Sequence, residues 1–154
     1  MKGSCLCGKV RYELTSQPRS VVACHCTQCR KTSGHYVAAT QIDRDSLELQ
    51  GSENITWFRS SEEAVRGFCS FCGSQLFWMI ENSTTISIMA GSLDRPTGLV
   101  MDRQIHSSSK GDYYSLPNCQ KVTQSSLRKV WRIPNSLVGI EPAVCRHDVV
   151  QMNC

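Results

Sequence analysis

The sequence lacks long apolar runs, tracts of like charge and low-complexity segments. No stretch approaches the roughly 18 apolar residues of a membrane-spanning helix. The N-terminus, which begins Met1-Lys2-Gly3, has no apolar core of the kind found in secretory signals. The net charge of +4 is too small and too evenly spread to favour nucleic acid. We therefore expect a cytoplasmic protein without a membrane or nucleic-acid partner, and the sequence leaves oligomerisation open.

The chain has no fold-sized repeat and no long helical periodicity, which favours a mainly β domain. Its 154 residues suit one domain with its own core. Short β-branched and aromatic segments separated by turn residues predict strands at 10–14, 36–42, 55–59, 75–80 and 84–89. Short helices are expected at 30–33 and 124–132. We expect a zinc-binding domain over 1–117 and a C-terminal extension, 118–154, packed on the same domain.

Ten cysteines require an explanation in a chain of this size. Disulfides are rare in a reducing compartment, where dense cysteine indicates metal binding or catalysis. A disulfide framework is the alternative. It fits poorly because the pairs in Cys5-Leu6-Cys7 and Cys24-His25-Cys26 would point the same way along a strand and seldom bridge.

Two cysteine pairs share one pattern, since each is followed directly by glycine. Cys5 and Cys7 precede Gly8, and Cys69 and Cys72 precede Gly73. Glycine readily takes the positive φ that a ligating turn needs after its last cysteine. Four thiolates are the usual donors of a closed structural zinc site. We predict a structural zinc held by these two pairs, with independent redox dithiols as the alternative.

The third cysteine group, Cys24, Cys26 and Cys29, has no local fourth ligand. Three protein ligands and one open position are typical of a catalytic zinc. A substrate thiol at that position would be held as a thiolate. The alternative is a second structural site, closed by a fourth ligand from this set: His35, His106, Cys119 or Cys145. Strand alternation would point His25 away from the group.

Arg30 and Lys31 follow Cys29 directly. Three thiolates on a divalent zinc leave a net negative charge, which nearby cations would offset. Arginine also recognises carboxylates through two parallel hydrogen bonds. We therefore expect Arg30 and Lys31 to bind a carboxylate-bearing ligand. The alternative is that both are solvated surface charges.

The combined pattern resembles the glutathione-dependent formaldehyde-activating enzymes, which share a domain with centromere protein V. The similarity spans roughly residues 3–117, and the matching segments are 3–12, 24–34, 57–61, 66–74 and 91–94. It implies the β-tent fold, in which short antiparallel sheets lean together around zinc-binding loops. It implies structural ligands at Cys5, Cys7, Cys69 and Cys72, and catalytic ligands at Cys24, Cys26 and Cys29.

The activity implied by the resemblance is carbon–sulfur lyase chemistry, the reversible addition of glutathione to formaldehyde that gives S-hydroxymethylglutathione. Candidate proton donors are His35, His106, Tyr113 and water. The sequence departs from the family at Gln104, where histidine is common, and at Tyr113 or Tyr114, where tryptophan is common. Because this region is expected to line the substrate pocket, a different thiol or electrophile is an open alternative.

Two other classes of function stay open. A non-catalytic glutathione carrier would use the same residues, and a zinc-stabilised interaction module would need an exposed apolar patch or a basic stripe. We expect Trp57, Trp78 and Trp131 to lie in the core rather than in such a patch.

Overall fold

A computed structural model describes residues 1–116 of the chain. The predicted helix at 124–132, the extension 118–154, Trp131 and the three last cysteines, Cys119, Cys145 and Cys154, lie outside the described residues. Within residues 1–116, no helix is long and apolar enough to cross a membrane.

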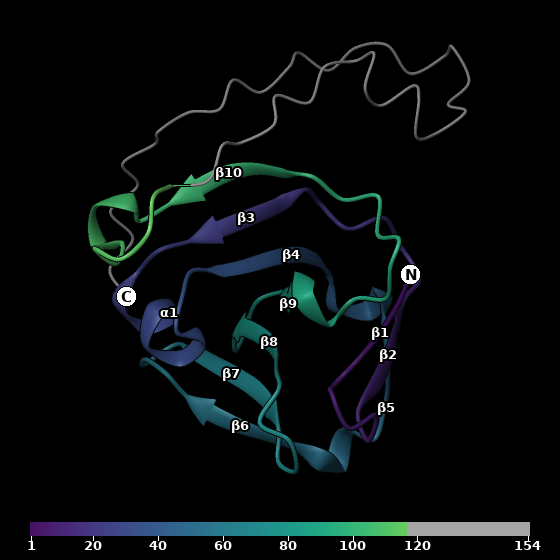
Figure 1. Cartoon of the computed structure of the whole chain (residues 1–154). Helices are drawn as coiled ribbons and strands as arrows, with labels where there is room; N and C mark the ends of the chain where they lie inside the picture. Colours follow the sequence, from purple (N-terminus) through teal and green to yellow (C-terminus); the bar gives the residue numbers. More distant parts are fainter. Residues whose placement is uncertain (117–154) are drawn as a thin grey trace, which may run out of the picture.

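The described residues form two β-sheets and one α-helix, α1 (Thr27–Ser33). The small sheet has the order β1-β2-β5 and is antiparallel throughout. Its strands are β1 (Lys2–Ser4), β2 (Arg11–Leu14) and β5 (Leu47–Gln50). In Figure 1 this sheet stands beside the N-terminus, and α1 lies at the opposite end of the molecule.

The large sheet curves around the molecule in the order β10-β3-β4-β9-β8-β7-β6 (Figure 1). Its strands are β3 (Val21–Cys24), β4 (Val37–Asp43), β6 (Ile55–Arg59), β7 (Ala64–Cys69), β8 (Gln75–Ile80), β9 (Thr85–Met89) and β10 (Met101–Ile105). Four 3₁₀ turns complete the described elements: η1 (Arg44–Ser46), η2 (Ser52–Asn54), η3 (Ala90–Ser92) and η4 (Ser107–Ser109).

Two groups of buried side chains fill the interior. The larger contains Tyr12, Leu76, Phe77 and Ile88, and it includes the buried Cys5 and Cys69. The smaller lies at the α1 end, where Cys26, Cys29, Val37 and Met89 pack with Cys24 and Trp78 at its margin. Each cysteine group therefore has members in the core, Cys5 and Cys69 in the larger and Cys26 and Cys29 in the smaller.

The mainly β architecture is confirmed, with two corrections. We expected antiparallel sheets, but β10 pairs with β3 in parallel. This is possible because the long connection through 25–100 returns the chain to the same edge with the same direction. Trp57 was expected in the core, but it is 40% exposed. Its ring covers Gly67 on the neighbouring strand, where an added Cβ would lie 2.8 Å from the indole.

Candidate metal centres

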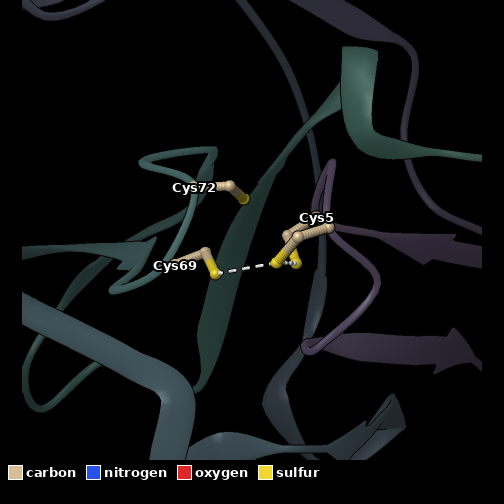
Figure 2. A group of neighbouring side chains, drawn as sticks. Cys5, Cys69 and Cys72 are labelled. Carbon is tan, nitrogen blue, oxygen red and sulfur yellow. Dashed lines mark hydrogen bonds between the residues drawn. The ribbon is translucent and has the colours of Figure 1, made fainter.

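The two cysteine pairs that precede Gly8 and Gly73 come together at one end of the small sheet. We call Cys5, Cys7, Cys69 and Cys72 the tetracysteine group, because their four sulfur atoms all lie within 4.8 Å of one another. Cys5 and Cys7 come from the turn after β1, Cys69 is the last residue of β7, and Cys72 lies in the turn between β7 and β8. Figure 2 shows the sulfurs of Cys69 and Cys72 directed toward Cys5.

The geometry of the tetracysteine group fits a tetrahedral metal. A zinc ion with Zn–S bonds of roughly 2.3 Å requires sulfur–sulfur separations of about 3.8 Å. Cys7 Sγ lies 3.5 Å from Cys5 Sγ and 3.7 Å from Cys69 Sγ. The donor set and its spacing therefore suit zinc, while the role of these residues as ligands stays a prediction.

Backbone hydrogen bonds set both turns of this group. The Gly8 N–H donates to the Cys5 carbonyl at 3.0 Å, and the Gly73 N–H donates to the Cys69 carbonyl at 2.9 Å. Gly8 and Gly73 have φ of 73° and 71°, as expected for the residue after each pair. The Val10 N–H also points at Cys5 Sγ at 3.3 Å, an arrangement that favours a thiolate at Cys5.

The other three cysteines of residues 1–116 meet where β3 ends and α1 begins. We call Cys24, Cys26 and Cys29 the tricysteine group, since their sulfurs also lie within 4.8 Å of one another. Cys24 is the last residue of β3, Cys26 is the N-cap of α1, and Cys29 lies in its first turn. The Cys29 N–H donates to Cys26 Sγ at 3.4 Å.

The helix begins earlier than the sequence indicated. We expected an extended segment through Cys26 and a helix only after Cys29, but α1 begins at Thr27. The reason is that Cys26 caps the helix with its own sulfur, a role usually taken by a serine or aspartate oxygen. The three cysteines are thus brought together by a strand end and a helix start.

The electrostatics of the tricysteine group favour a cation. Hydrogen bonds from the Cys24 and Cys29 thiols lower the pKa of Cys26, and the hydrogen bond to Cys26 raises the pKa of Cys24. Without a cation, the shared hydrogen bonds favour one thiolate and disfavour a second beside it. A divalent ion would instead let all three ionise, so the donor chemistry fits zinc.

No fourth ligand completes the tricysteine group among residues 1–116. His35 is exposed, and its ring centroid lies 4.2 Å from that of Tyr114. His106 has a left-handed φ of 56° before η4 and is also outside the sulfur group. Two of the four proposed closing ligands, Cys119 and Cys145, lie outside the described residues.

His25 lies between Cys24 and Cys26 in the sequence, and its side chain is fully buried. It is not part of the tricysteine group. Its Nε2 lies 3.0 Å from Gln104 Oε1, and its Nδ1 lies 2.8 Å from the Tyr114 hydroxyl. Because Gln104 Oε1 only accepts, Nε2 carries the proton and Nδ1 accepts from Tyr114. Gln104 and Tyr114 thus fix the ring that lies between two predicted ligands.

The predicted carboxylate-binding residues lie in the second half of α1. Arg30 is half-buried, and its Nε is buried with no hydrogen-bond partner among residues 1–116. Lys31 is exposed. Among the candidate proton donors, Tyr113 donates its hydroxyl proton to the Gly34 carbonyl at 3.0 Å.

Sequence reasoning missed two residues beside the tricysteine group. Arg66, on β7, directs Nη2 toward Cys29 Sγ at 3.9 Å and donates from the same atom to Gln28 Oε1 at 3.0 Å. Arg66 and Gln28 both lie inside the segments that carried the family resemblance. Spacing alone, however, does not show that β7 passes the start of α1. Within residues 1–116, the guanidinium of Arg66 thus contacts the sulfur of a predicted ligand.

Comparison with known proteins decides the family. The model of the family described as glutathione-dependent formaldehyde-activating enzyme matches residues 1–109. The chain belongs to this family. A Halomonas elongata protein named "Putative glutathione-dependent formaldehyde-activating enzyme" is 34% identical over 89 residues, which are 53% of this chain and 56% of that protein. The chain thus matches little more than half the length of that relative.

Two further relatives extend the comparison. A protein of Schizosaccharomyces pombe named as an uncharacterized lyase is 27% identical over 119 residues, covering 76% of this chain and 85% of that protein. The crystal structure of a Rhodobacter sphaeroides protein is similar with a TM-score of 0.51 and 26% identity. That match covers 62% of this chain and 89% of the Rhodobacter chain, so the shared fold includes nearly all of that protein.

Proposed function

We propose that this protein is a zinc-dependent carbon–sulfur lyase-type enzyme that joins a thiol, glutathione in the first instance, to formaldehyde or another small electrophile. The observation that carries the proposal is the tricysteine group, three converging sulfurs with no fourth ligand among residues 1–116. The family and the lyase name of one relative support the same reaction class.

The two cysteine groups have different roles in this proposal. The tetracysteine group holds a structural zinc that ties β1 to the β7–β8 turn, which are far apart in sequence. The tricysteine group holds the second zinc through Cys24, Cys26 and Cys29. That metal, when bound, supplies positive charge that keeps a substrate thiol ionised at neutral pH.

The reaction balances without an added oxidant or reductant. The thiol gives up its proton to solvent, and its sulfur forms a bond to the carbonyl carbon of formaldehyde. The π-electron pair of the carbonyl moves to oxygen, which takes a proton from solvent to give the S-hydroxymethyl product. The protein's residues hold the sulfur in place and limit its freedom, which lowers the entropic part of the barrier.

Arg30 and Lys31 complete the proposed site on α1. Glutathione carries two carboxylates, and cations on the helix that also bears Cys29 would attract them toward the tricysteine group. Their place in the last turn of α1 also suits the negative end of the helix dipole. Replacing both with glutamine should therefore weaken glutathione binding and leave binding of an uncharged thiol unchanged.

The test compares adduct formation with and without the protein. Glutathione and formaldehyde are mixed at neutral pH, and the rate of S-hydroxymethylglutathione formation is followed by exchange NMR. The zinc-loaded wild type should exceed the spontaneous rate, and Cys26→Ser should not. The tetracysteine group serves as an internal control, because Cys26→Ser should keep one zinc per chain. Glutathione binding by the wild type without a rate increase would overturn the enzyme in favour of a carrier.

A further inference from the structure

Arg66 lies on β7 with its guanidinium turned toward the tricysteine group. Nη2 lies 3.9 Å from Cys29 Sγ, within the range of a weak hydrogen bond to sulfur. Cys29 is itself buried. The two groups therefore interact with little water between them, which strengthens the attraction between a guanidinium and a thiolate.

A second residue holds the guanidinium in this position. Gln28 accepts from Arg66 Nη2 through Oε1 at 3.0 Å and donates through Nε2 to the Ser60 carbonyl at 3.1 Å. Gln28 lies next to Cys29 in α1, and Ser60 follows the end of β6. The side chain of Gln28 thus joins the helix that bears Cys29 to the strands that carry Arg66.

No carboxylate neutralises Arg66 within the described residues. The two salt bridges found there join Lys2 to Glu13 and Arg59 to Glu81. Arg66 Nε is buried and has no hydrogen-bond partner in residues 1–116. A half-buried guanidinium without an acid is costly unless another negative charge offsets it. The ionisable group that it contacts is the thiol of Cys29, a member of the tricysteine group.

The charge balance gives this arrangement a function. Three thiolates and one divalent ion carry −1, and a fourth thiolate would bring the complex to −2. We propose that Arg66 is a specificity-determining residue, whose positive charge makes the fourth position of the tricysteine site select an anionic thiolate over a neutral ligand. This inference rests on the open fourth position of the proposed function and adds the residue that chooses its occupant.

The distances are compatible with that role. Any fourth ligand of a tetrahedral zinc lies about 3.8 Å from the sulfur of Cys29. The guanidinium is therefore at most about 8 Å from it, no more than one Debye length at physiological salt. Arg66 need not touch the incoming ligand, because its charge acts on the complex as a whole.

The experiment uses full-length protein loaded with cobalt, whose visible absorption reports each ligand that joins the metal. The wild type, Arg66→Met and Arg66→Lys are titrated with glutathione, with 2-mercaptoethanol and with imidazole. The first is a charged thiol, the second an uncharged thiol and the third a neutral nitrogen ligand. Arg59→Gln is the matched control, because it removes the same charge from the neighbouring strand, where the guanidinium bonds Glu81.

Arg66→Met should lower the affinity for both thiols by about tenfold or more and leave the affinity for imidazole unchanged. Arg66→Lys should recover most of the thiol affinity, and Arg59→Gln should match the wild type. Unchanged thiol affinity in Arg66→Met would overturn the inference. A loss of affinity confined to glutathione would also overturn it, because Arg66 would then act on a glutathione carboxylate. An equal loss of affinity for all three ligands would overturn it as well.

Two readouts separate this inference from failure of the proposed function. If the wild type shows no spectral response to either thiol, the open thiol site itself is wrong. If the wild type responds and Arg66→Met responds equally, only the role of Arg66 is wrong. Should Arg66→Met fail to keep metal at the tetracysteine group, Arg66→Gln, which also removes the charge, is titrated in its place, and the same losses are expected.

Discussion

The hydroxyl oxygen of Ser74 lies 3.3 Å from Cys72 Sγ. The same oxygen accepts a hydrogen bond from the Leu6 N–H at 3.0 Å, so its own proton is available to the sulfur. The hydrogen bond from Ser74 lowers the pKa of Cys72 to about 5. One side chain thus joins the two turns of the tetracysteine group and favours the thiolate that a metal needs.

Ser74→Ala should weaken metal binding at the tetracysteine group by about tenfold to a hundredfold, the usual effect of removing a hydrogen bond to a ligand. Competition with a chromophoric chelator measures this affinity. Ser70→Ala is the matched control, because Ser70 lies in the same turn but donates to the Asn54 carbonyl at 3.1 Å. Equal affinity in Ser74→Ala and Ser70→Ala would show that the Ser74 contact has no part in binding.

Gly3→Ala should destabilise the fold without altering metal content. A Cβ at Gly3 would overlap the Tyr12 ring and lie 2.6 Å from the Ser92 carbonyl oxygen. Overpacking of this kind costs about 1–3 kcal/mol. Thermal unfolding of the zinc-loaded protein measures the loss, with Gly91→Ala as control, since nothing lies within 4 Å of an added Cβ there. A melting temperature unchanged by Gly3→Ala would contradict the packing of β1 on β2.

The stability of the protein should fall in alkaline solution through Tyr12. Burial raises the pKa of Tyr12 to about 12, whereas an unfolded tyrosine titrates near about 10. The folded protein therefore keeps the Tyr12 proton to a higher pH than the unfolded chain does. The contribution is complete below pH 10 and is lost as the pH rises through the folded pKa. The loss should reach about 2–3 kcal/mol.

Tyr12→Phe isolates this effect from other alkaline transitions. The wild type and the variant should differ by a constant amount below pH 10, set by the lost hydrogen bond between Tyr12 and Ser92. Between pH 10 and 12 the wild type alone should lose the extra stability in denaturant titrations. Parallel pH profiles for the two proteins would show that the Tyr12 hydroxyl is not held neutral in the core.

Gln28 should act through Arg66 rather than independently. Gln28→Ala removes the acceptor of Arg66 Nη2, so the guanidinium should spend less time at Cys29 Sγ. We expect weaker glutathione binding to the cobalt-loaded protein, with the effect absent when Arg66→Met is already present. The double-mutant cycle measures this coupling. Additive effects of the two changes would place Gln28 outside the contact with Arg66.

Much of the fold followed from short-range signals. Strands β6 and β8 begin and end where alternation and β-branched residues placed them, at Ile55–Arg59 and Gln75–Ile80. The glycines after each cysteine pair have the expected positive φ. The missed strands include β1 and β10, which are short or contain polar residues such as Asp102 and Gln104. These strands form because neighbouring strands pair with them, which local propensity does not show.

The cysteine groups were predictable because spacing and donor chemistry both constrain them. Their surroundings were not, since Arg66 contacts Cys29 across 37 residues of sequence and Ser74 contacts the Leu6 N–H across 68. The capping of α1 by Cys26 was also missed, because a cysteine is an unusual N-cap. Side chains that tune a site from another strand therefore required the fold, whereas the ligands themselves did not.

The central claim is that the tricysteine group binds metal with one position open to a thiol. Zinc per chain, measured with and without dialysis against glutathione, tests it most directly. We predict two zinc ions per chain in the wild type, one of them labile and changed in its retention by glutathione, and one zinc in Cys26→Ser that glutathione leaves in place. Two zinc ions in Cys26→Ser, or a single wild-type zinc that glutathione never perturbs, would contradict the account.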